Sequence, residues 1–464
     1  MLFNTYEFIF IYLPLVFFGF FWLAKHKGQK TSSAYLVIAS LCFYGYWDAR
    51  YVPLLLLSIL FNFCIGRQIE HSNEKKNFWL LAGIAGNLTL LGYYKYMGFF
   101  IATLNSLTGF NNDIPTIILP LGISFFTFTQ TAYLIDAYRG ETKGSSIINY
   151  MLFVTIFPHL IAGPIINWRD MLPQFLAKEN YKLNYDNIAR GLMFFIIGLF
   201  KKVVIADTIA VGVNRAYGVA DALSFYDAWF AAIGYTLQLY FDFSGYSEMA
   251  VGLALLFNIK LPFNFNSPYK SCSIIDFWRR WHMTLGAWVK NYLYIPLGGN
   301  RLGEVRKSFN LFISMLLIGL WHGAGWTFVA WGALHGAFLL VNHQWRRLGI
   351  ALPKVLSWGL TFLTVNFLWV LFRSPDFATA IQIISTMLDF NNIGSFSRSH
   401  GAWGTRGIFN MTVIAFVLVL IMPNTQTIVA RFRPRRRYLA LAVVLMFTTM
   451  YYLSQISDFL YFQF

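Results

Sequence analysis

Long apolar runs recur along the whole of this 464-residue sequence and limit its fold more than any other feature. A helix needs roughly 20 mostly apolar residues to cross the hydrocarbon core of a membrane. The candidate runs are 7–24, 34–47, 53–66, 78–101, 116–138, 191–206, 228–241, 309–329, 356–372, 408–422 and 438–454. Only 12% of the residues are charged, against about 25% in soluble domains. The sequence therefore predicts an all-α polytopic membrane protein with roughly 10–12 transmembrane helices, some only partly inserted.

The basic residues gather at the ends of the apolar runs. The first run is followed by Lys25, Lys27 and Lys30, and the last run is preceded by Arg431, Arg433, Arg435, Arg436 and Arg437. Positive charge beside a span marks its cytoplasmic side. This placement predicts extracytoplasmic N- and C-termini, and it attributes the net charge of +16 to orientation and anionic membrane lipids rather than to nucleic acid.

Two stretches, 150–187 and 257–303, are too polar and too rich in Pro and Gly to cross a membrane as plain helix. Irregular backbone at membrane depth persists only where protein or a water-filled cavity satisfies it, so we expect these stretches to be re-entrant or interfacial and to line a site. Within the second stretch, residues 276–294 have the pattern of one amphipathic interfacial helix. We find no linker and predict a single domain over residues 1–464. The scattered Cys42, Cys64 and Cys272 are interpreted as packing residues.

His322 is the leading candidate for chemistry because it lies inside an apolar run with no charged residue between Asn310 and Leu340. Ionisable groups within spans are costly and usually functional. On a continuous helix, Gly319 and Gly325 would flank His322 at three residues on either side and leave room for a backbone or ligand. Histidine is the usual general base near neutral pH. The alternative is a buried histidine that is hydrogen-bonded to a neighbouring helix.

The other histidines are weaker candidates. His335 lies 13 residues beyond His322, roughly 140° around an ideal helix, so the two would share a face only if the region of Gly332 broke the helix. We therefore expect His335 to be structural or pore-lining. His282 borders the second irregular stretch beside Arg279 and Arg280, where a contact with a headgroup or phosphate is as plausible as catalysis.

Asn291 and Asp242 are polar residues with two interpretations each. The Asn291 amide, next to the amphipathic segment, could orient an imidazole or hold an acyl carbonyl. Asp242, with Glu248 nearby, suggests acid–base work or a proton path, and the alternative is pairing with an Arg or Lys of another segment. The sequence has no phosphate-binding glycine loop, dinucleotide fingerprint, metal-ligand cluster or serine nucleophile motif, so we expect no metal and no tightly bound cofactor.

Five motifs in order resemble the bacterial membrane-bound O-acyltransferase family. They are Leu119-Pro120-Leu121-Gly122-Ile123-Ser124-Phe125 with Ile135-Asp136-Ala137-Tyr138-Arg139-Gly140, Asp242-Phe243-Ser244-Gly245-Tyr246, Asp276-Phe277-Trp278-Arg279-Arg280-Trp281-His282, Tyr292-Leu293-Tyr294-Ile295-Pro296-Leu297-Gly298-Gly299 and Trp321-His322-Gly323. The motif-bearing core covers about residues 120–373. The chain is most similar to the branch that O-acetylates alginate and to its relative that acts on peptidoglycan.

The resemblance implies a ring of tilted helices around a central funnel and tunnel in the bacterial inner membrane. It also implies that His322 is the active-site histidine and that Asn291 takes the partner position, although many members of the branch carry Asp there. Candidates for lining the tunnel or the substrate site are His282, Trp321, Trp326, Asp242 and His335. The donor implied is cytoplasmic acetyl-CoA, whose polyanionic body cannot cross the membrane, so only the acetyl group passes. The residues that bind the donor are not identified.

The aromatic tail, residues 458–464, follows the last run and is placed outside by the predicted orientation. A tail of this kind recurs in the branch. We hypothesise that the hydroxyl of Tyr461 accepts the acetyl group at the outer mouth and that a periplasmic acetyltransferase partner then delivers it to an extracytoplasmic polysaccharide. The alternative is that the aromatic side chains anchor the tail at the membrane interface.

Two other functions remain compatible with the residues. A polytopic exporter of polysaccharide or lipid-linked saccharide would also be basic and aromatic, but it would not need a lone histidine between glycines. Within the family, direct acylation of a lipid or a protein is the alternative, and it would need a lateral opening to the lipid that the sequence does not reveal.

Overall fold

The computed structural model describes residues 1–464 except 73, 143, 145, 394–405, 434 and 454–464. The described residues form helices joined by turns and irregular segments, with no strand among them. This confirms the predicted all-α class. The chain divides into two compact units, Met1–Phe195 with Ser247–Pro262, and Ile196–Tyr246 with Phe263–Phe464. The single domain predicted for residues 1–464 stays a prediction.

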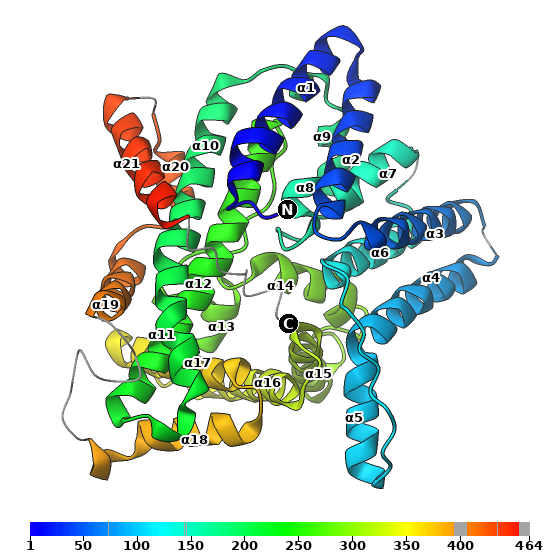
Figure 1. Cartoon of the computed structure of the whole chain (residues 1–464). Helices are drawn as coiled ribbons and strands as arrows, with labels where there is room; N and C mark the ends of the chain where they lie inside the picture. Colours follow the sequence, from blue (N-terminus) through cyan, green and yellow to red (C-terminus); the bar gives the residue numbers. More distant parts are fainter. Residues whose placement is uncertain (73, 143, 145, 394–405, 434, 454–464) are drawn as a thin grey trace. The chain divides into compact units, whose positions relative to one another are not determined.

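The first unit consists of the N-terminal helices and one later segment. Its elements are η1 (Phe8–Tyr12), α1 (Leu13–His26), α2 (Gln29–Gly45), η2 (Ala49–Tyr51), α3 (Val52–His71), α4 (Lys76–Leu91), η3 (Gly92–Tyr96), α5 (Met97–Thr108), α6 (Ile123–Tyr138), α7 (Ile147–Thr155), α8 (Phe157–Leu160), α9 (Trp168–Leu176), η4 (Lys178–Tyr181) and most of α10 (Tyr185–Phe200). Helices α3, α4 and α6 pack side by side, as do α1 and α2 (Figure 1).

Buried amides join two of these helices. The Asn62 side chain on α3 donates to Asn87 Oδ1 on α4 at 2.9 Å, and Asn87 donates back to Asn62 Oδ1 at 2.8 Å. Within a membrane, the hydrophobic effect does not drive helices together, so interhelical hydrogen bonds of this kind contribute to their association. The pair therefore fixes the register of α3 against α4.

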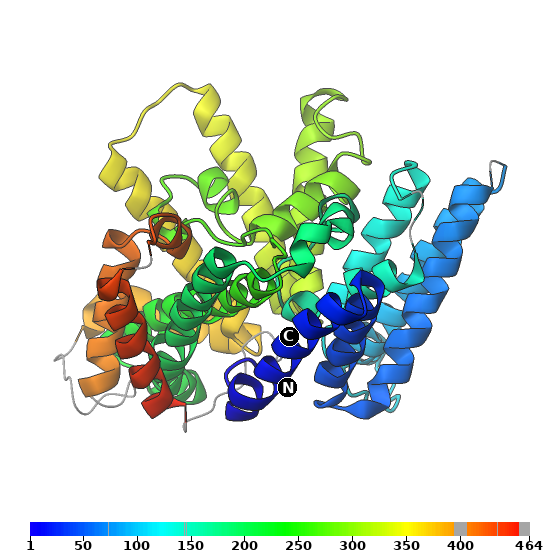
Figure 2. The same cartoon turned by 90° about the horizontal axis from the view of Figure 1, so that it is seen from above.

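The second unit contains the remaining helices (Figure 2). Its elements are η5 (Lys201–Ala206), α11 (Asp207–Gly218), η6 (Ala220–Ala222), most of α12 (Phe225–Leu256), η7 (Pro268–Lys270), α13 (Ile274–Trp278), α14 (Met283–Val289), η8 (Lys290–Tyr294), α15 (Gly303–His322), α16 (Trp326–Arg347), α17 (Lys354–Arg373), α18 (Phe377–Leu388), η9 (Phe390–Asn392), α19 (Arg406–Ile421), α20 (Thr425–Ala430) and α21 (Arg436–Tyr452).

Each predicted apolar run contains helix, but the run 309–329 is interrupted at residues 323–325 and the run 116–138 is helical only from Ile123. Among the described residues, three helical stretches are long and apolar enough to cross a membrane by length and composition: Phe8–His26, Ala49–His71 and Lys354–Arg373. Shorter apolar helices cover 377–388, 406–421 and 438–452. The predicted number of spans stays a prediction. The run 228–241 is part of one 32-residue helix, α12. This helix continues without a break through the polar residues beyond Phe241.

The two irregular stretches are confirmed as interrupted rather than plain helices. Residues 150–187 contain only short helices separated by turns, and residues 257–303 are mostly turns around α13, α14 and η8. The prediction of packing cysteines is wrong for two of the three, because Cys42 and Cys64 are exposed on α2 and α3, while Cys272 is half-buried.

Candidate active site

His322 is the last residue of α15, not the middle of a longer helix. The chain is extended at Gly323 and Gly325, and α16 begins at Trp326. The prediction that Gly319 and Gly325 flank His322 on one helix is therefore wrong. A Cβ on Gly323 would overlap the Phe328 ring, so any larger residue there would force that ring to move. The break turns α15 and α16 into a closely packed hairpin.

Two glycines let the backbones of α15 and α16 touch. A Cβ on Gly332 would lie 2.5 Å from Met315 O and 3.0 Å from Gly319 Cα, and a Cβ on Gly319 would meet the Phe328 carbonyl and Gly332. Small residues allow this kind of close crossing. The prediction that Gly319 admits another backbone next to the histidine is confirmed, and that backbone belongs to α16.

Aromatic rings surround His322, which is only 4% exposed. The ring centres of Trp331 on α16 and Phe372 on α17 both lie 5.3 Å from that of the imidazole, and Trp321 lies at 5.0 Å. These rings hold the imidazole in a water-poor site, where charge–dipole interactions are stronger than in water. The C-terminal end of α15 carries partial negative charge, which favours an imidazolium formed when His322 accepts a proton.

His335 belongs to the same cluster, which corrects the prediction that it faces elsewhere. Its ring centre lies 4.6 Å from that of Trp331, which also contacts His322. Trp278 Nε1 donates a hydrogen bond to His335 Nδ1 at 3.2 Å, which leaves Nε2 to carry the proton of the neutral ring. The helix break at residues 323–325, not at Gly332, brings the two histidines together.

His282 also reaches this cluster, from the irregular stretch. It is 1% exposed, its backbone is left-handed (φ 43°), and it caps α14. Its ring centre lies 4.8 Å from Phe243 and 6.4 Å from His322. The predicted single amphipathic helix over 276–294 is therefore wrong, since the chain breaks between α13 and α14 and turns His282 inward, away from a headgroup at the surface.

Asn264 holds the turn that carries His282. Its carbonyl accepts from Met283 N at 2.8 Å, and its side-chain Oδ1 accepts from the Thr284 hydroxyl at 2.6 Å. These bonds satisfy donors at the first turn of α14 and stabilise the left-handed residue before it. The stretch 257–303 thus delivers a buried imidazole through irregular backbone, as its composition predicted for a site-lining segment.

Asp242 belongs to a buried ion cluster. Of the roles predicted for it, the structure shows the pairing with a basic residue of another segment. Lys202 Nζ lies 2.8 Å from Asp242 Oδ1 and 2.6 Å from Asp207 Oδ1, and all three side chains are at most 9% exposed. Glycine at Gly245 permits this contact, because a Cβ there would lie 2.6 Å from Gly198 O. The Asp242-Phe243-Ser244-Gly245 motif therefore joins two helices through Asp242 and supports His282 through Phe243.

The remaining predicted residues lie in different surroundings. Trp321 is buried beside both His322 and His282, at ring-centre distances of 5.0 and 6.2 Å. Trp326 is 53% exposed at the start of α16. Asn291 is half-buried in η8, directly after α14. Tyr461 and the aromatic tail lie outside the described residues, so their roles stay predictions.

Two adjoining cavities approach this cluster from α14, α15 and α16. The first cavity, about 430 Å³, has mainly apolar walls and reaches Trp278, which donates to His335. The second cavity, about 460 Å³, has basic side chains in its lining. Both are lined by Lys290, Tyr294, Leu311 and His343. The two cavities together combine basic and apolar lining residues close to Trp278.

The arrangement suits proton transfer in a dry site. His322 can accept a proton, and His282 can hold or polarise a reactant beside it, since paired groups in distinct environments can divide these tasks. In the part of the chain that the structure describes, no group of three His, Cys, Asp or Glu side chains is placed to hold a metal ion.

Sequence reasoning missed Lys202, Trp278 and Trp331. Lys202 had a detectable signal, because it is a cation inside the predicted run 191–206. Trp278 lies in one of the family-like motifs but was not singled out. Trp331 is one of many tryptophans in apolar helices, and only the hairpin reveals that it contacts both His322 and His335.

Comparisons with known proteins agree with these features. Residues 10–374 match the membrane-bound O-acyltransferase family. The chain is 45% identical to a peptidoglycan O-acetyltransferase of Helicobacter pylori, over 85% of this chain and 81% of the relative. It is 41% identical to a probable alginate O-acetylase of Pseudomonas aeruginosa, over 84% and 75% of the two chains. A teichoic acid D-alanyltransferase of Bacillus subtilis is 29% identical, over 55% and 69%.

Proposed function

Because this chain belongs to the membrane-bound O-acyltransferase family and is an O-acyltransferase, we propose that it moves acetyl groups from cytoplasmic acetyl-CoA to the O-acetylation of an extracytoplasmic polysaccharide. The chain is a membrane protein, and its proposed place is the bacterial inner membrane with both termini outside. The relatives named for peptidoglycan and alginate acetylation support this acceptor class. The observation that carries the proposal is the buried His322, enclosed by aromatic rings with His282 beside it.

His322 acts as the general base in this proposal. It takes the proton from the acceptor hydroxyl while the hydroxyl oxygen attacks the acetyl carbonyl carbon. The tetrahedral intermediate then expels the thiolate of coenzyme A, which takes the proton from the imidazolium. One C–O bond forms and one C–S bond breaks. A thioester is sufficiently activated for a base and a polarised carbonyl to suffice, and Asn291 or His282 would supply the polarising contact.

The two adjoining cavities support an entry route for the donor. Coenzyme A combines phosphates, which suit the basic lining of the second cavity near Arg301 and Lys290, with a slender arm that suits the apolar walls of the first cavity. That cavity reaches Trp278, which contacts His335, and Trp331 joins His335 to His322. A donor in the first cavity would therefore reach Trp278, from which these ring contacts lead to His322.

We further propose that Tyr461 accepts the acetyl group and that a periplasmic acetyltransferase collects it. The support is the extracytoplasmic placement of the tail by the charge pattern of the sequence. In this relay, the Tyr461 hydroxyl is the acceptor of the first transfer, and the phenyl ester that forms is itself activated for the second. Direct acylation of a lipid or protein is less favoured, since two relatives carry names of polysaccharide acetylation.

Donor binding is tested with the purified protein in proteoliposomes and labelled acetyl-CoA. Replacing Lys290 and Arg301 with Gln should raise KM for acetyl-CoA on the order of 10-fold, because hydrogen bonds between charged groups contribute ~1.5–3 kcal/mol each before screening. The matched control replaces the exposed Lys354 and Arg406 with Gln and should leave KM unchanged. An equal effect of both pairs would reject the cavities as the donor route. A lack of labelled transfer by the wild type to any acceptor would reject acetyl-CoA as donor.

A further inference from the structure

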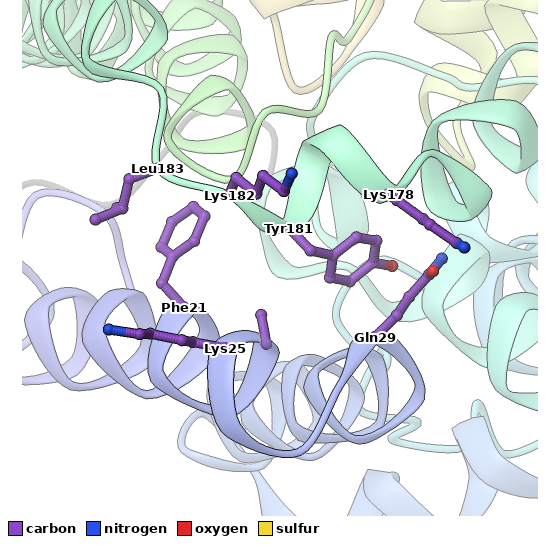
Figure 3. Close-up of a pocket in the computed structure, with 8 residues that line it drawn as sticks. Phe21, Lys25, Gln29, Lys178, Tyr181, Lys182 and Leu183 are labelled. Carbon is purple, nitrogen blue, oxygen red and sulfur yellow. The ribbon is translucent and has the colours of Figure 1, made fainter.

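A third cavity, about 560 Å³, lies within the first unit where α1 ends beside η4. Figure 3 shows its lining: Lys25 comes from the last turn of α1, and Lys178 and Lys182 come from η4 and the residue after it. The rings of Phe21 and Tyr181 lie between these lysines. The cavity thus combines three long cationic side chains with an aromatic floor.

Hydrogen bonds hold the wall of this cavity in place. The Tyr181 hydroxyl donates to Phe175 O at 2.8 Å and lies 2.8 Å from the Ser33 hydroxyl. Gln29 Nε2 donates to the same Phe175 carbonyl at 2.7 Å. Burial raises the pKa of Tyr181, so the phenol stays neutral and adds no negative charge. The aromatic surface that Tyr181 contributes to the cavity is therefore rigid and uncharged.

Asn258 fixes the backbone that carries the two η4 lysines. It adopts the left-handed conformation (φ 60°), and its side-chain amide donates to Asn180 O at 2.9 Å and Lys182 O at 2.8 Å. Asn187 in turn donates to Asn258 Oδ1 at 2.9 Å. A left-handed non-glycine residue persists only where its surroundings require it. The lysine-bearing turn is thus prearranged by contacts that serve no catalytic residue.

The charge of the cavity is unbalanced. No Asp or Glu lines it, and among the described residues none of the three lysines forms an ion pair. The nearest acid in sequence, Glu179, is exposed between Lys178 and the rest of η4. Three uncompensated cations favour an anion with several oxygens.

The position of the cavity at the end of a helix able to cross a membrane indicates where that anion comes from. Lys25 lies in the last turn of Phe8–His26, one of the helices able to cross a membrane. On the same helix, Phe18 is 70% exposed and Trp22 is 57% exposed, which is the surface expected to meet acyl chains and headgroups. We propose that this cavity binds the phosphate headgroup of an anionic phospholipid, whose acyl chains lie along the exposed apolar face of α1. Basic pockets at the cytoplasmic ends of spans bind lipid headgroups in this manner.

The test measures lipid retention by the purified full-length protein in detergent, using native mass spectrometry with phosphatidylglycerol and phosphatidylcholine as probes. The wild type should bind one phosphatidylglycerol more tightly than phosphatidylcholine. Replacing Lys25, Lys178 and Lys182 with Gln should weaken the binding of phosphatidylglycerol on the order of 100-fold, since each lysine near a membrane surface contributes about fivefold to the affinity. The single substitution Lys182→Gln should weaken this binding about fivefold, and it tests the site if the triple variant does not fold.

A matched control separates the site from general charge. Lys27, Lys30 and Lys260 are exposed lysines of the same unit outside the cavity lining, and their replacement by Gln removes the same charge. Retained phosphatidylglycerol in this control, with loss in the cavity variant, supports the proposal. Equal loss in both overturns it.

A competition experiment distinguishes the lipid from the other phosphate source. Free coenzyme A should not displace phosphatidylglycerol. If coenzyme A displaces it and its own binding needs the same lysines, the cavity holds the phosphates of the donor and the lipid assignment is wrong. The proposal does not depend on acetyl transfer, because neither probe reports activity.

Discussion

Gly332→Ala should separate α15 from α16 and disable the site. The added Cβ would lie 2.5 Å from Met315 O, 3.0 Å from Gly319 Cα and 3.1 Å from Gly319 N. All three are backbone atoms, so no side chain can rotate away. The helices must move apart, and they carry His322 on one side and Trp331 on the other.

The magnitude follows from two opposing effects. Alanine in place of glycine inside a helix gains roughly 1 kcal/mol of helix propensity. Forcing extra volume into a packed contact costs typically ~1–3 kcal/mol, and a backbone clash lies at the upper end of that range. We therefore expect Gly332→Ala to lower the free energy of unfolding by about 1–2 kcal/mol. A displacement of the base by about 1 Å can lower the rate of acyl transfer on the order of 100-fold.

The assay compares Gly332→Ala with Gly359→Ala on α17, where a Cβ would meet no atom within 4 Å. Gly359→Ala should be neutral or stabilising by up to ~1 kcal/mol and should keep full activity. Thermal unfolding in detergent gives the stability, and labelled acetate transferred gives the activity. Wild-type stability and activity in Gly332→Ala would refute the backbone contact and the dependence of His322 on it.

Three further predictions concern single residues. Lys202→Met should destabilise the protein by roughly 3–5 kcal/mol, because it removes the cation that Asp207 and Asp242 both contact, and Lys202→Met with Asp242→Asn should recover part of this loss in thermal unfolding. Trp278→Phe keeps the aromatic contact with His335 but loses its donor, so transfer should fall several-fold at little cost in stability; unchanged steady-state kinetics would contradict this. Tyr461→Phe should abolish polymer acetylation at unchanged membrane levels, and full acetylation would exclude the relay.

Local sequence patterns predicted most of the helices, since every apolar run contains helix, although the run 309–329 is interrupted. They also predicted that 257–303 lines a site, because Pro, Gly and polar residues at membrane depth require protein around them. His322, Trp321 and His282 were identified from unusual polarity or motif position, and the structure brings these three together. Their chemical roles stay predictions.

Long-range packing was not predictable. Gly323 and Gly325 are compatible with a helix in an apolar run, and only the Phe328 ring packed against Gly323 shows why the chain turns there. On an ideal, unbroken helix, His335 would point away from the side that carries His322. Likewise, Lys202 and Asp242 are 40 positions apart, and their pairing depends on the close approach that Gly245 allows.

The most direct test of the central claim replaces His322 with Ala in the native host. Wild type and variant are compared at matched membrane levels, and ester-linked acetate is measured on each exported polysaccharide together with the amount of polymer. If His322 is the base, acetate disappears from one polymer while that polymer is still made. Unchanged acetate, or loss of the polymer itself, would show that His322 is not the base for acetyl transfer.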